Sequence, residues 1–250
     1  MLSNVLRRKP IAQTIEHALP AFHHRAMHDW EGRLHSGLRL TWPCEESLEF
    51  QALYPSVLGR VKSFPVDVTE SANLDMARGL WCLIRHLKPR TIVETGVGLG
   101  VTSRFVLEAL AMNRSGHLYS VAPPDGDPVS KSRVGLAVEP RVAHRWSLIA
   151  DTTKRALPGL LPRVGLVDLY IHDTKSTGNG MHYEIDMAWA SLKPGGALVI
   201  GHIDYNGAFQ YLAQSQRDYK ALIGETEPDR VLAHDPEPKS QFAIAFKNWR

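Results

Sequence analysis

Cysteine is scarce in this 250-residue chain, and long apolar runs are missing from it. The two cysteines, Cys44 and Cys82, are too few for a disulfide framework and are not spaced as a metal-binding knuckle. Every uninterrupted apolar run is shorter than ten residues, so none can span a bilayer. Arg7, Arg8 and Lys9 are followed by no apolar segment or small-residue cleavage site, which argues against a secretory signal. We therefore expect a reducing, cytoplasmic location and no membrane partner.

An excess of charge of one sign is missing as well. The chain has 29 Lys and Arg residues against 26 Asp and Glu, a formal net charge of +3. A nucleic-acid partner would favour a stronger and more concentrated basic character, so we expect none. Hydrophobic residues make up 44% of the chain and charged residues 22%, as in ordinary globular proteins. The length suits one domain with a modest extension.

The chain divides into two regions that differ in composition and in the pattern of expected helices and strands. Residues 1–66 contain five of the twelve histidines and have the pattern of helical stretches interrupted by prolines. From residue 67 to 250, strands alternate with helices, which is typical of βαβ units on a parallel sheet. We expect an N-terminal helical extension or cap over 1–66 and one α/β domain over 67–250. The interrupting prolines are Pro10, Pro20, Pro43, Pro55 and Pro65.

Hydrophobic periodicity places the elements of the second region. Helices are expected at 71–86, 101–113, 181–192 and 208–216, the first capped by Thr69 or Ser71 and followed by Pro89. Strands are expected at 91–93, 118–121, within 142–149, at 164–171, 197–200 and 242–246, with a weaker candidate around 230–233. The Lys-Pro-Gly-Gly run at 193–196 predicts a break before the fifth strand. These elements predict a doubly wound, seven-stranded Rossmann-like sheet that binds ligands at the carboxyl ends of its strands.

A glycine-rich turn follows the first strand and opens a helix. It reads Glu94-Thr95-Gly96-Val97-Gly98-Leu99-Gly100. Glycine allows sharp turns and lets backbone amides approach a ligand without a Cβ in the way. The G-x-G-x-G spacing differs from the dinucleotide fingerprint, and a carboxylate two residues before the first glycine would repel a pyrophosphate. That carboxylate can accept a hydrogen bond from an ammonium group, so the turn favours a ligand with a cationic amino-acid end. Glycines that serve packing alone are the alternative.

The stretch from about Thr69 to Phe209 resembles the class I S-adenosylmethionine (SAM)-dependent methyltransferases, in particular methyltransferase family 24. Five landmarks in the family's order carry the resemblance. They are the glycine motif at 94–100, the end of the second strand at 118–124, Ala150-Asp151-Thr152, Tyr170-Ile171-His172-Asp173, and the turn at 193–196. The resemblance implies a methyltransferase sheet and SAM as the cofactor.

The resemblance also assigns roles to individual residues. It implies that Glu94 and the glycine turn face the methionine part of SAM, and that Asp151 approaches the adenine amine. The cofactor-binding residues that we expect are Glu94, Thr95, Gly96, Gly98, Gly100, Ser103, Val121, Ala122, Asp151 and Asp173.

The sequence departs from the family at three positions. A family acid that chelates the ribose hydroxyls is replaced by Ala122, a loss of about 1.5–3 kcal/mol for a charge-assisted contact unless Asp125 or Asp127 substitutes. A family histidine after the fourth strand is replaced by Ser176. A family Asp-Asp pair after the fifth strand becomes Gly201-His202.

Three hypotheses remain for the polar residues near the ends of the fourth and fifth strands. His202 or His172 could act as the general base that removes a hydroxyl proton, which is the catalytic assignment we adopt. Asp173, His202 and Asn206 could instead bind a divalent cation, but a single carboxylate is a poor ligand set for Mg²⁺, which prefers oxygen ligands. The histidines could also only order the loop. The N-terminal histidines lack a completing ligand set, so we predict no metal site.

We expect a SAM-dependent methyltransferase that O-methylates a small hydroxylated metabolite. The N-terminal helices and the segment after the fifth strand would shape the acceptor pocket. A methyltransferase fold with different chemistry and a non-catalytic scaffold stay open, because the ribose acid at Ala122 is missing. A homodimer is left open as the assembly.

Overall fold

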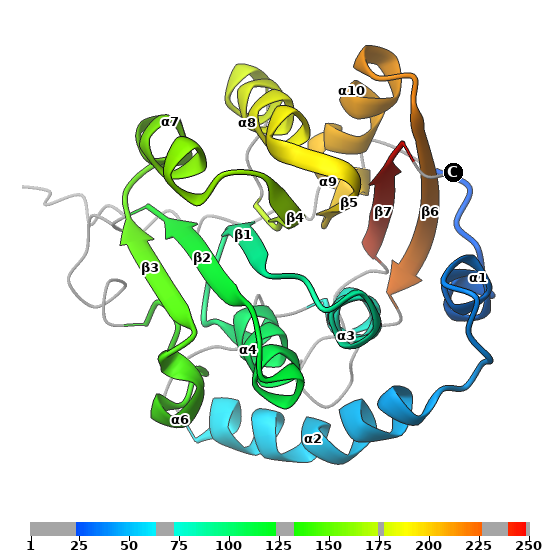
Figure 1. Ribbon diagram of the computed structural model, residues 1–250, viewed down its shortest axis with the longest axis vertical. Helices are drawn as coiled ribbons and strands as arrows, with labels where there is room; N and C mark the ends of the chain where they lie inside the picture. Colours follow the sequence, from blue (N-terminus) through cyan, green and yellow to red (C-terminus); the bar gives the residue numbers. More distant parts are fainter. Residues whose placement is uncertain (1–23, 64–72, 124–132, 175–177, 227–239, 249–250) are drawn as a thin grey trace, which may run out of the picture.

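A seven-stranded sheet runs through the centre of the computed structural model (Figure 1). The structure describes residues 24–63, 73–123, 133–174, 178–226 and 240–248. The strand order is β3-β2-β1-β4-β5-β7-β6, and β7 runs antiparallel to both of its neighbours. The strands are β1 (Thr91–Thr95), β2 (His117–Ala122), β3 (Trp146–Ala150), β4 (Val167–His172), β5 (Leu192–Ile200), β6 (Tyr219–Thr226) and β7 (Ser240–Lys247). The expected doubly wound sheet is confirmed.

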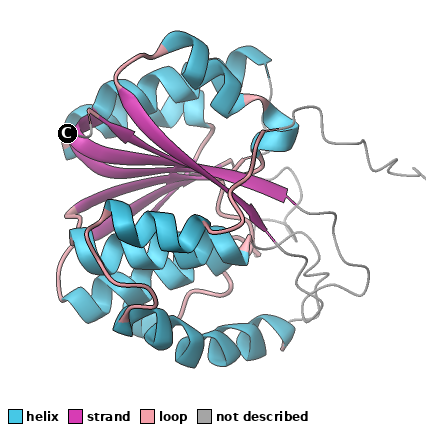
Figure 2. Ribbon diagram, turned by 90° about the vertical axis from the view of Figure 1, so that its right-hand side faces the viewer, coloured by secondary structure: helices cyan, strands magenta, loops and turns pink. Residues whose placement is uncertain are grey.

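Helices cover both faces of the sheet (Figure 2). One face carries α3 (Leu74–Leu87), α4 (Val101–Asn113) and α6 (Pro140–Ala143), with α1 (Trp30–Gly37) and α2 (Glu45–Lys62) on the same side (Figure 1). The other face carries α7 (Thr153–Val164), α8 (Gly178–Ser191), α9 (Ile203–Asn206) and α10 (Ala208–Ser215). In the described part of the chain, no helix is both long and apolar enough for a membrane span.

Helix α3 shows how the sequence fixes an element and its packing. The side chain of Asn73 accepts a hydrogen bond from the Met76 amide and caps the first turn. The helix ends at Lys88 in the left-handed conformation, directly before Pro89, as the sequence predicts. Its inner face buries Leu80 and Ile84 completely, and burial of such a side chain stabilises the fold by about 1.5–3 kcal/mol. Thr69 and Ser71, the expected caps, lie outside the described residues.

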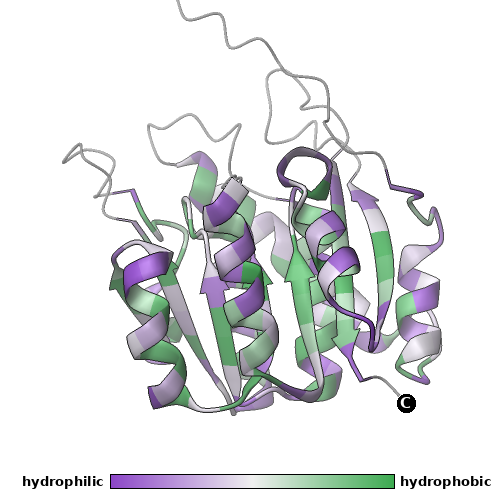
Figure 3. Ribbon diagram, turned by 90° about the horizontal axis from the view of Figure 1, so that it is seen from above, coloured by the Kyte–Doolittle hydropathy of each residue, from purple (hydrophilic) through white to green (hydrophobic). Residues whose placement is uncertain are grey.

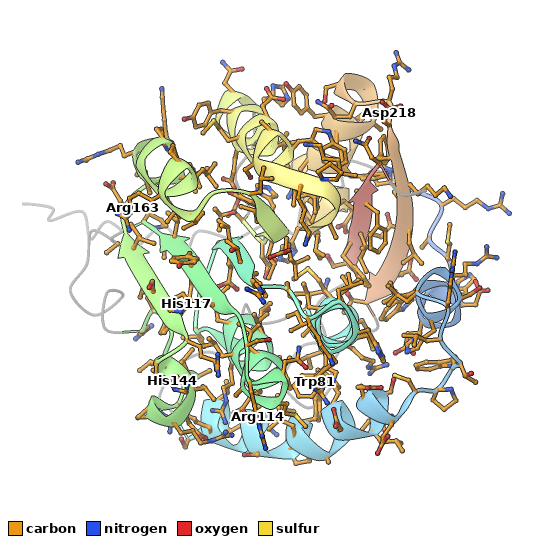
Figure 4. All side chains as sticks on the ribbon, viewed as in Figure 1. Trp81, Arg114, His117, His144, Arg163 and Asp218 are labelled. Carbon is orange, nitrogen blue, oxygen red and sulfur yellow. The ribbon has the colours of Figure 1, made fainter. Side chains whose placement is uncertain are left out.

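Helix α4 is buried on nearly all sides because it lies between the sheet and α2. Its residues from Val101 to Leu110 are buried without interruption. The outer helix α2 is fastened to α3 by the Trp81 indole, which donates to the Glu46 carbonyl at 2.8 Å. Figure 4 shows Trp81 between these two helices. The described N-terminal helices therefore share one core with α3 and α4. The proposed boundary at residue 66 lies outside the described residues and stays a prediction.

Most of the expected elements are present with small shifts at their ends. The helix over 101–113 and the strand cores at 91–93, 118–121, 197–200 and 242–246 are confirmed. These strands are strongly apolar, and Figure 3 shows the hydrophobic colouring of the central sheet. Their apolar runs could be recognised in the sequence because helices cover both faces of the sheet and the strands are buried.

Four features were missed or placed wrongly. Strand β6 was missed because it is a half-exposed edge strand with few buried side chains, and the candidate at 230–233 lies outside the described residues. Helix α7 was also missed; it contains Pro158 and Pro162, and it includes Val164, which the sequence assigned to the next strand. The run 193–196, predicted as a break before the fifth strand, lies inside β5. The pairing of β5 with β4 shifts register there, which accommodates the two glycines within the strand. Pro55 lies inside α2 and does not break it, because burial of Val57, Leu58 and Val61 outweighs one lost hydrogen bond.

Candidate functional site

The glycine turn connects β1 to α4, and its three glycines have different reasons to be glycine. All three have a positive φ, of 85° at Gly96, 50° at Gly98 and 79° at Gly100. A Cβ on Gly96 would lie 2.0 Å from the Asp173 carbonyl oxygen, and one on Gly100 would lie 2.7 Å from the Cα of Gly135. A Cβ on Gly98 would meet no described atom within 4 Å. Packing explains two of the glycines, and Gly98 is the position where a ligand can approach the backbone.

The segment from Gly135 to Ala137 fixes the glycine turn through backbone hydrogen bonds. The Gly135 amide donates to the Gly98 carbonyl at 3.1 Å, and the Ala137 amide donates to the Leu99 carbonyl at 2.9 Å. The buried guanidinium of Arg104 donates to the Ala137 carbonyl at 3.0 Å. The turn is thus fixed by the chain itself, which is the preorganisation that a binding loop requires.

Glu94 lies behind the turn and is completely buried. Its Oε2 accepts hydrogen bonds from Ser103 Oγ at 2.7 Å and from Ser120 Oγ at 2.6 Å. Its Oε1 is buried and accepts no hydrogen bond from the described residues. A buried carboxylate oxygen without a donor is costly, and a cationic donor at that oxygen would satisfy it.

Ser120 is a functional residue that the sequence reasoning missed. It lies on β2 directly opposite Glu94 of β1, so both side chains point to the same face of the sheet. The Trp146 indole of β3 donates to Ser120 Oγ at 2.9 Å and fixes its orientation toward Glu94. The period-2 pattern of two aligned strands was the signal that could have found it.

The environment of Glu94 raises the pKa of its carboxyl to about 7. Burial is the main cause, because it disfavours the charged form, and the nearby Asp173 charge adds to it. The two serine hydrogen bonds act in the opposite direction and limit the rise. Near neutral pH, a cationic ligand would therefore shift Glu94 toward its ionised form.

Thr95 and His172 point to the opposite face of the sheet. The two residues are register partners on β1 and β4, and both side chains contact Glu184 of α8. The Thr95 hydroxyl donates to Glu184 Oε1, and His172 Nδ1 donates to the same oxygen at 2.5 Å. His172 is completely buried, so this position favours a structural role over that of a base for a bound substrate. Thr95 can contribute to the glycine site through its backbone alone.

Asp173 and His202 meet at the ends of β4 and β5. His202 Nε2 lies 3.5 Å from Asp173 Oδ1, and the imidazole is partly exposed. His202 has a φ of 53°, an uncommon conformation for a histidine that is often found at functional sites. A Cβ on Gly201 would lie 2.4 Å from Asp173 Oδ1. The family's acid at position 201 would therefore clash with Asp173, and glycine there is what allows the Asp173–His202 pair.

Asn206 has its side chain committed to the loop after β5. Its amide nitrogen donates to the carbonyls of Thr174 and Gly201 at 3.2 and 3.1 Å. Its amide oxygen accepts from the Ala208 backbone at 3.0 Å. This arrangement gives Asn206 a positioning role for the loop of His202 and favours the base hypothesis over the cation hypothesis.

The remaining expected contacts lie at the ends of β2 and β3. The Val121 carbonyl accepts a hydrogen bond from the Gly96 amide at 3.2 Å, so β2 ends beside the glycine turn. Ala122 is buried and pairs with Ala150. Asp151 follows at the end of β3, where its Oδ1 accepts from the Thr152 amide at 2.8 Å. Asp125 and Asp127, the substitutes considered for the missing ribose acid, lie outside the described residues.

Comparison with known proteins agrees with this geometry. Residues 93–203 match a family model described as a methyltransferase domain. The O-methyltransferase TomG from Streptomyces achromogenes, solved with SAM, superposes with a TM-score of 0.56 at 18% identity, over 88% of this chain and 99% of its own. An O-methyltransferase from Bacillus cereus, solved with S-adenosylhomocysteine (SAH), has a TM-score of 0.56 at 14% identity, over 87% and 98%. No curated protein sequence matches the chain.

The matched residues include the glycine turn, Glu94, Asp173 and His202, and the two solved structures share the fold. Residues 93–203 therefore resemble a methyltransferase domain, and the chain has the fold of the two solved O-methyltransferases.

Proposed function

We propose that the site at the glycine turn binds SAM and that the protein O-methylates a small hydroxylated metabolite. The observation that carries the proposal is Glu94 Oε1, a buried carboxylate oxygen that no described residue satisfies. It lies behind a turn whose middle glycine, Gly98, is open toward any ligand. The amino-acid end of SAM has the ammonium group that this oxygen would accept.

The donor set of the site fits a SAM molecule at its amino-acid end. Glu94 and the amides of the glycine turn would bind the amino and carboxyl groups, and Ser103 and Ser120 would keep Glu94 oriented. The end of β2 at Ala122 offers no acid to the ribose, so affinity depends more strongly on the amino-acid end. When bound, SAM supplies an electrophilic sulfonium methyl group.

His202 is the residue we assign as the general base. Its imidazole is partly exposed, and Asp173 faces Nε2 at 3.5 Å, where the carboxylate can orient the ring. His202 would take the proton from the acceptor hydroxyl as the oxygen receives the methyl group. His172, completely buried against Glu184, would hold the ends of β1 and β4 in place.

The acceptor class rests on two kinds of support. A histidine base suits a hydroxyl acceptor, whose proton has to be removed during transfer. Both structural relatives are O-methyltransferases, and TomG is involved in tomaymycin synthesis. At 14–18% identity these relatives indicate the fold, so the small hydroxylated acceptor is our inference from the base.

The variant His202→Asn tests the proposal, because asparagine tolerates the left-handed backbone that position 202 requires. A panel of small phenols and alcohols would be incubated with SAM, and SAH formation would be measured. We expect turnover of the accepted compound to fall roughly a hundredfold or more in the variant, the scale of general base catalysis. We expect the Kd for SAH to change less than about threefold, since no ligand contact is assigned to His202.

Unchanged turnover in His202→Asn would refute the assignment of the base. No turnover of any compound by a wild type that binds SAH would favour the alternative, a methyltransferase fold with other chemistry or a scaffold role. The missing ribose acid at Ala122 is the observation behind that alternative.

A further inference from the structure

Three residues that are distant in the sequence bring metal-ligating atoms together on the outer side of α3. They are His35 near the end of α1, Cys44 directly before α2, and His86 near the end of α3. Their ligand atoms all lie within 4.8 Å of one another, and His35 Nε2 is 3.1 Å from Cys44 Sγ. Metal–ligand bonds of 2.0–2.3 Å in a tetrahedral zinc site place ligand atoms roughly 3.3–3.8 Å apart. The cluster needs only a small adjustment to reach that spacing.

The orientation of His35 is the one that a metal ligand adopts. Its Nδ1 lies 2.7 Å from the Glu31 carbonyl oxygen, which can only accept, so Nδ1 carries the proton. In the neutral ring, Nε2 then presents its lone pair toward Cys44. Zinc-binding histidines usually donate their second ring nitrogen to a carbonyl or carboxylate in this way.

His86 supplies a nitrogen that the described residues leave without a hydrogen bond. Its Nε2 is buried, and it faces Glu46 Oε2 at 3.3 Å. Glu46, at the start of α2, is thereby placed beside His86, where its carboxylate can supply the fourth ligand atom. The Trp81 indole donates to the Glu46 carbonyl and so fixes the backbone of Glu46. The neighbouring Arg85 pairs with Glu49 at 2.9 Å.

Charge and ligand type point to zinc. A thiolate from Cys44 and a carboxylate from Glu46 would neutralise one divalent cation, with two neutral imidazoles completing the shell. One sulfur and two nitrogens exclude Mg²⁺ and Ca²⁺ as preferred ions, because both prefer all-oxygen sites. The second cysteine, Cys82, lies behind Ser47 at 3.9 Å from its hydroxyl and faces the core.

We propose that His35, Cys44, His86 and Glu46 bind one Zn²⁺ ion in a closed structural site. The ion would tie α1 and the start of α2 to the end of α3, and so fix the N-terminal helices to the methyltransferase domain (Figure 1). The site is separate from the glycine turn and does not depend on the proposed reaction.

Cobalt binding to the untagged full-length chain tests this site. Metal-free protein, kept reduced, would be titrated with Co²⁺, followed by competition with Zn²⁺. We expect one equivalent to produce a thiolate-to-cobalt charge-transfer band with tetrahedral ligand-field absorption, and Zn²⁺ to displace it. Zn²⁺ should also raise the Tm of the wild type.

Two cysteine variants form a matched pair. We expect Cys44→Ser to lose the charge-transfer band and to bind Zn²⁺ at least roughly tenfold more weakly. Cys82→Ser keeps the ligand set, and we expect it to retain the band and the rise in Tm. His86→Gln is the second ligand variant, and circular dichroism of all metal-free proteins would show that they are folded. No band in the wild type, or a band that Cys44→Ser retains or Cys82→Ser alone loses, would overturn the site.

Discussion

At the scale of single residues, Glu94 determines how binding should depend on pH. Its carboxyl has a pKa of about 7 without ligand, whereas an ammonium ligand requires the ionised form. Below pH 7 the carboxyl is mostly protonated, and binding must then release that proton. The affinity for the cofactor should therefore increase as the pH rises through 7.

We expect the Kd for SAH to fall about eightfold between pH 6 and pH 7.5, measured by calorimetry. Glu94→Gln should remove most of this dependence and weaken binding by about 1.5–3 kcal/mol. Asp218→Asn is the matched control, because it removes an exposed carboxylate at the start of β6 (Figure 4). A Kd that rises with pH, or the same profile in Glu94→Gln, would contradict this role of Glu94.

Ala122 provides a second test at the residue scale. A carboxylate at this position would reach the ribose hydroxyls if the ribose lies where the family places it. Ala122→Asp should then strengthen SAH binding by about 1.5–3 kcal/mol, as measured by the same titration. Weaker binding would mean that the space beside β2 takes another group, and the methyltransferase proposal would lose support. An unchanged Kd would indicate that Asp125 or Asp127 already makes the contact.

At the scale of elements, Glu184 connects α8 to the ends of β1 and β4. Its carboxylate receives the Thr95 hydroxyl and His172 Nδ1 in a fully buried setting. Glu184→Ala would leave His172 Nδ1 buried without an acceptor and Thr95 with only the Ile171 carbonyl at 3.3 Å, and we expect the free energy of unfolding to fall by about 2–4 kcal/mol. Urea denaturation measures it, with Asp186→Ala on the exposed side of α8 as control. A change below about 1 kcal/mol in Glu184→Ala would show that the cluster does not stabilise the sheet.

The sequence predicted elements well where burial was complete and poorly where it was partial. Strands β4 and β5 have buried side chains on both faces, so their apolar runs were visible. Strand β6 is an edge strand with alternating exposure, and the prolines of α7 concealed a helix. Local sequence patterns indicate which segments are buried and where the chain turns. They are weak predictors of elements that are stabilised mainly by tertiary packing.

The residues of the candidate site likewise differ in how far the sequence could predict them. The glycine turn and Glu94 are contiguous in the sequence, so their chemistry could be inferred from it. Ser120 faces Glu94 only through the register of β2 against β1, which the period-2 pattern reveals once the two strands are aligned, and Glu184 reaches β1 through helix packing, for which the sequence carries no local signal. The cluster of His35, Cys44 and His86 was invisible for the same reason, because the fold brings three separate segments together.

At the scale of the whole molecule, the N-terminal helices belong to the outer layer of one face. Helix α2 lies over α3 and α4 (Figure 1). Near its end, Arg60 Nε donates to the Leu136 carbonyl at 3.3 Å, in the segment that backs the glycine turn. The described helices thus reach the site indirectly, through the segment that holds Gly98. Their expected role in shaping the acceptor pocket stays a prediction.

Above all, we propose that the glycine turn of this molecule binds SAM. The most direct measurement is calorimetric titration of SAH into the wild-type chain and into Gly98→Ala. We expect one SAH per chain in the wild type. In the variant we expect loss of binding with at most about 1–2 kcal/mol of lost stability, because a methyl group there meets no atom of the described residues within 4 Å and would point at the ligand. Equal affinity of the two folded proteins, or no binding by the wild type, would contradict the claim.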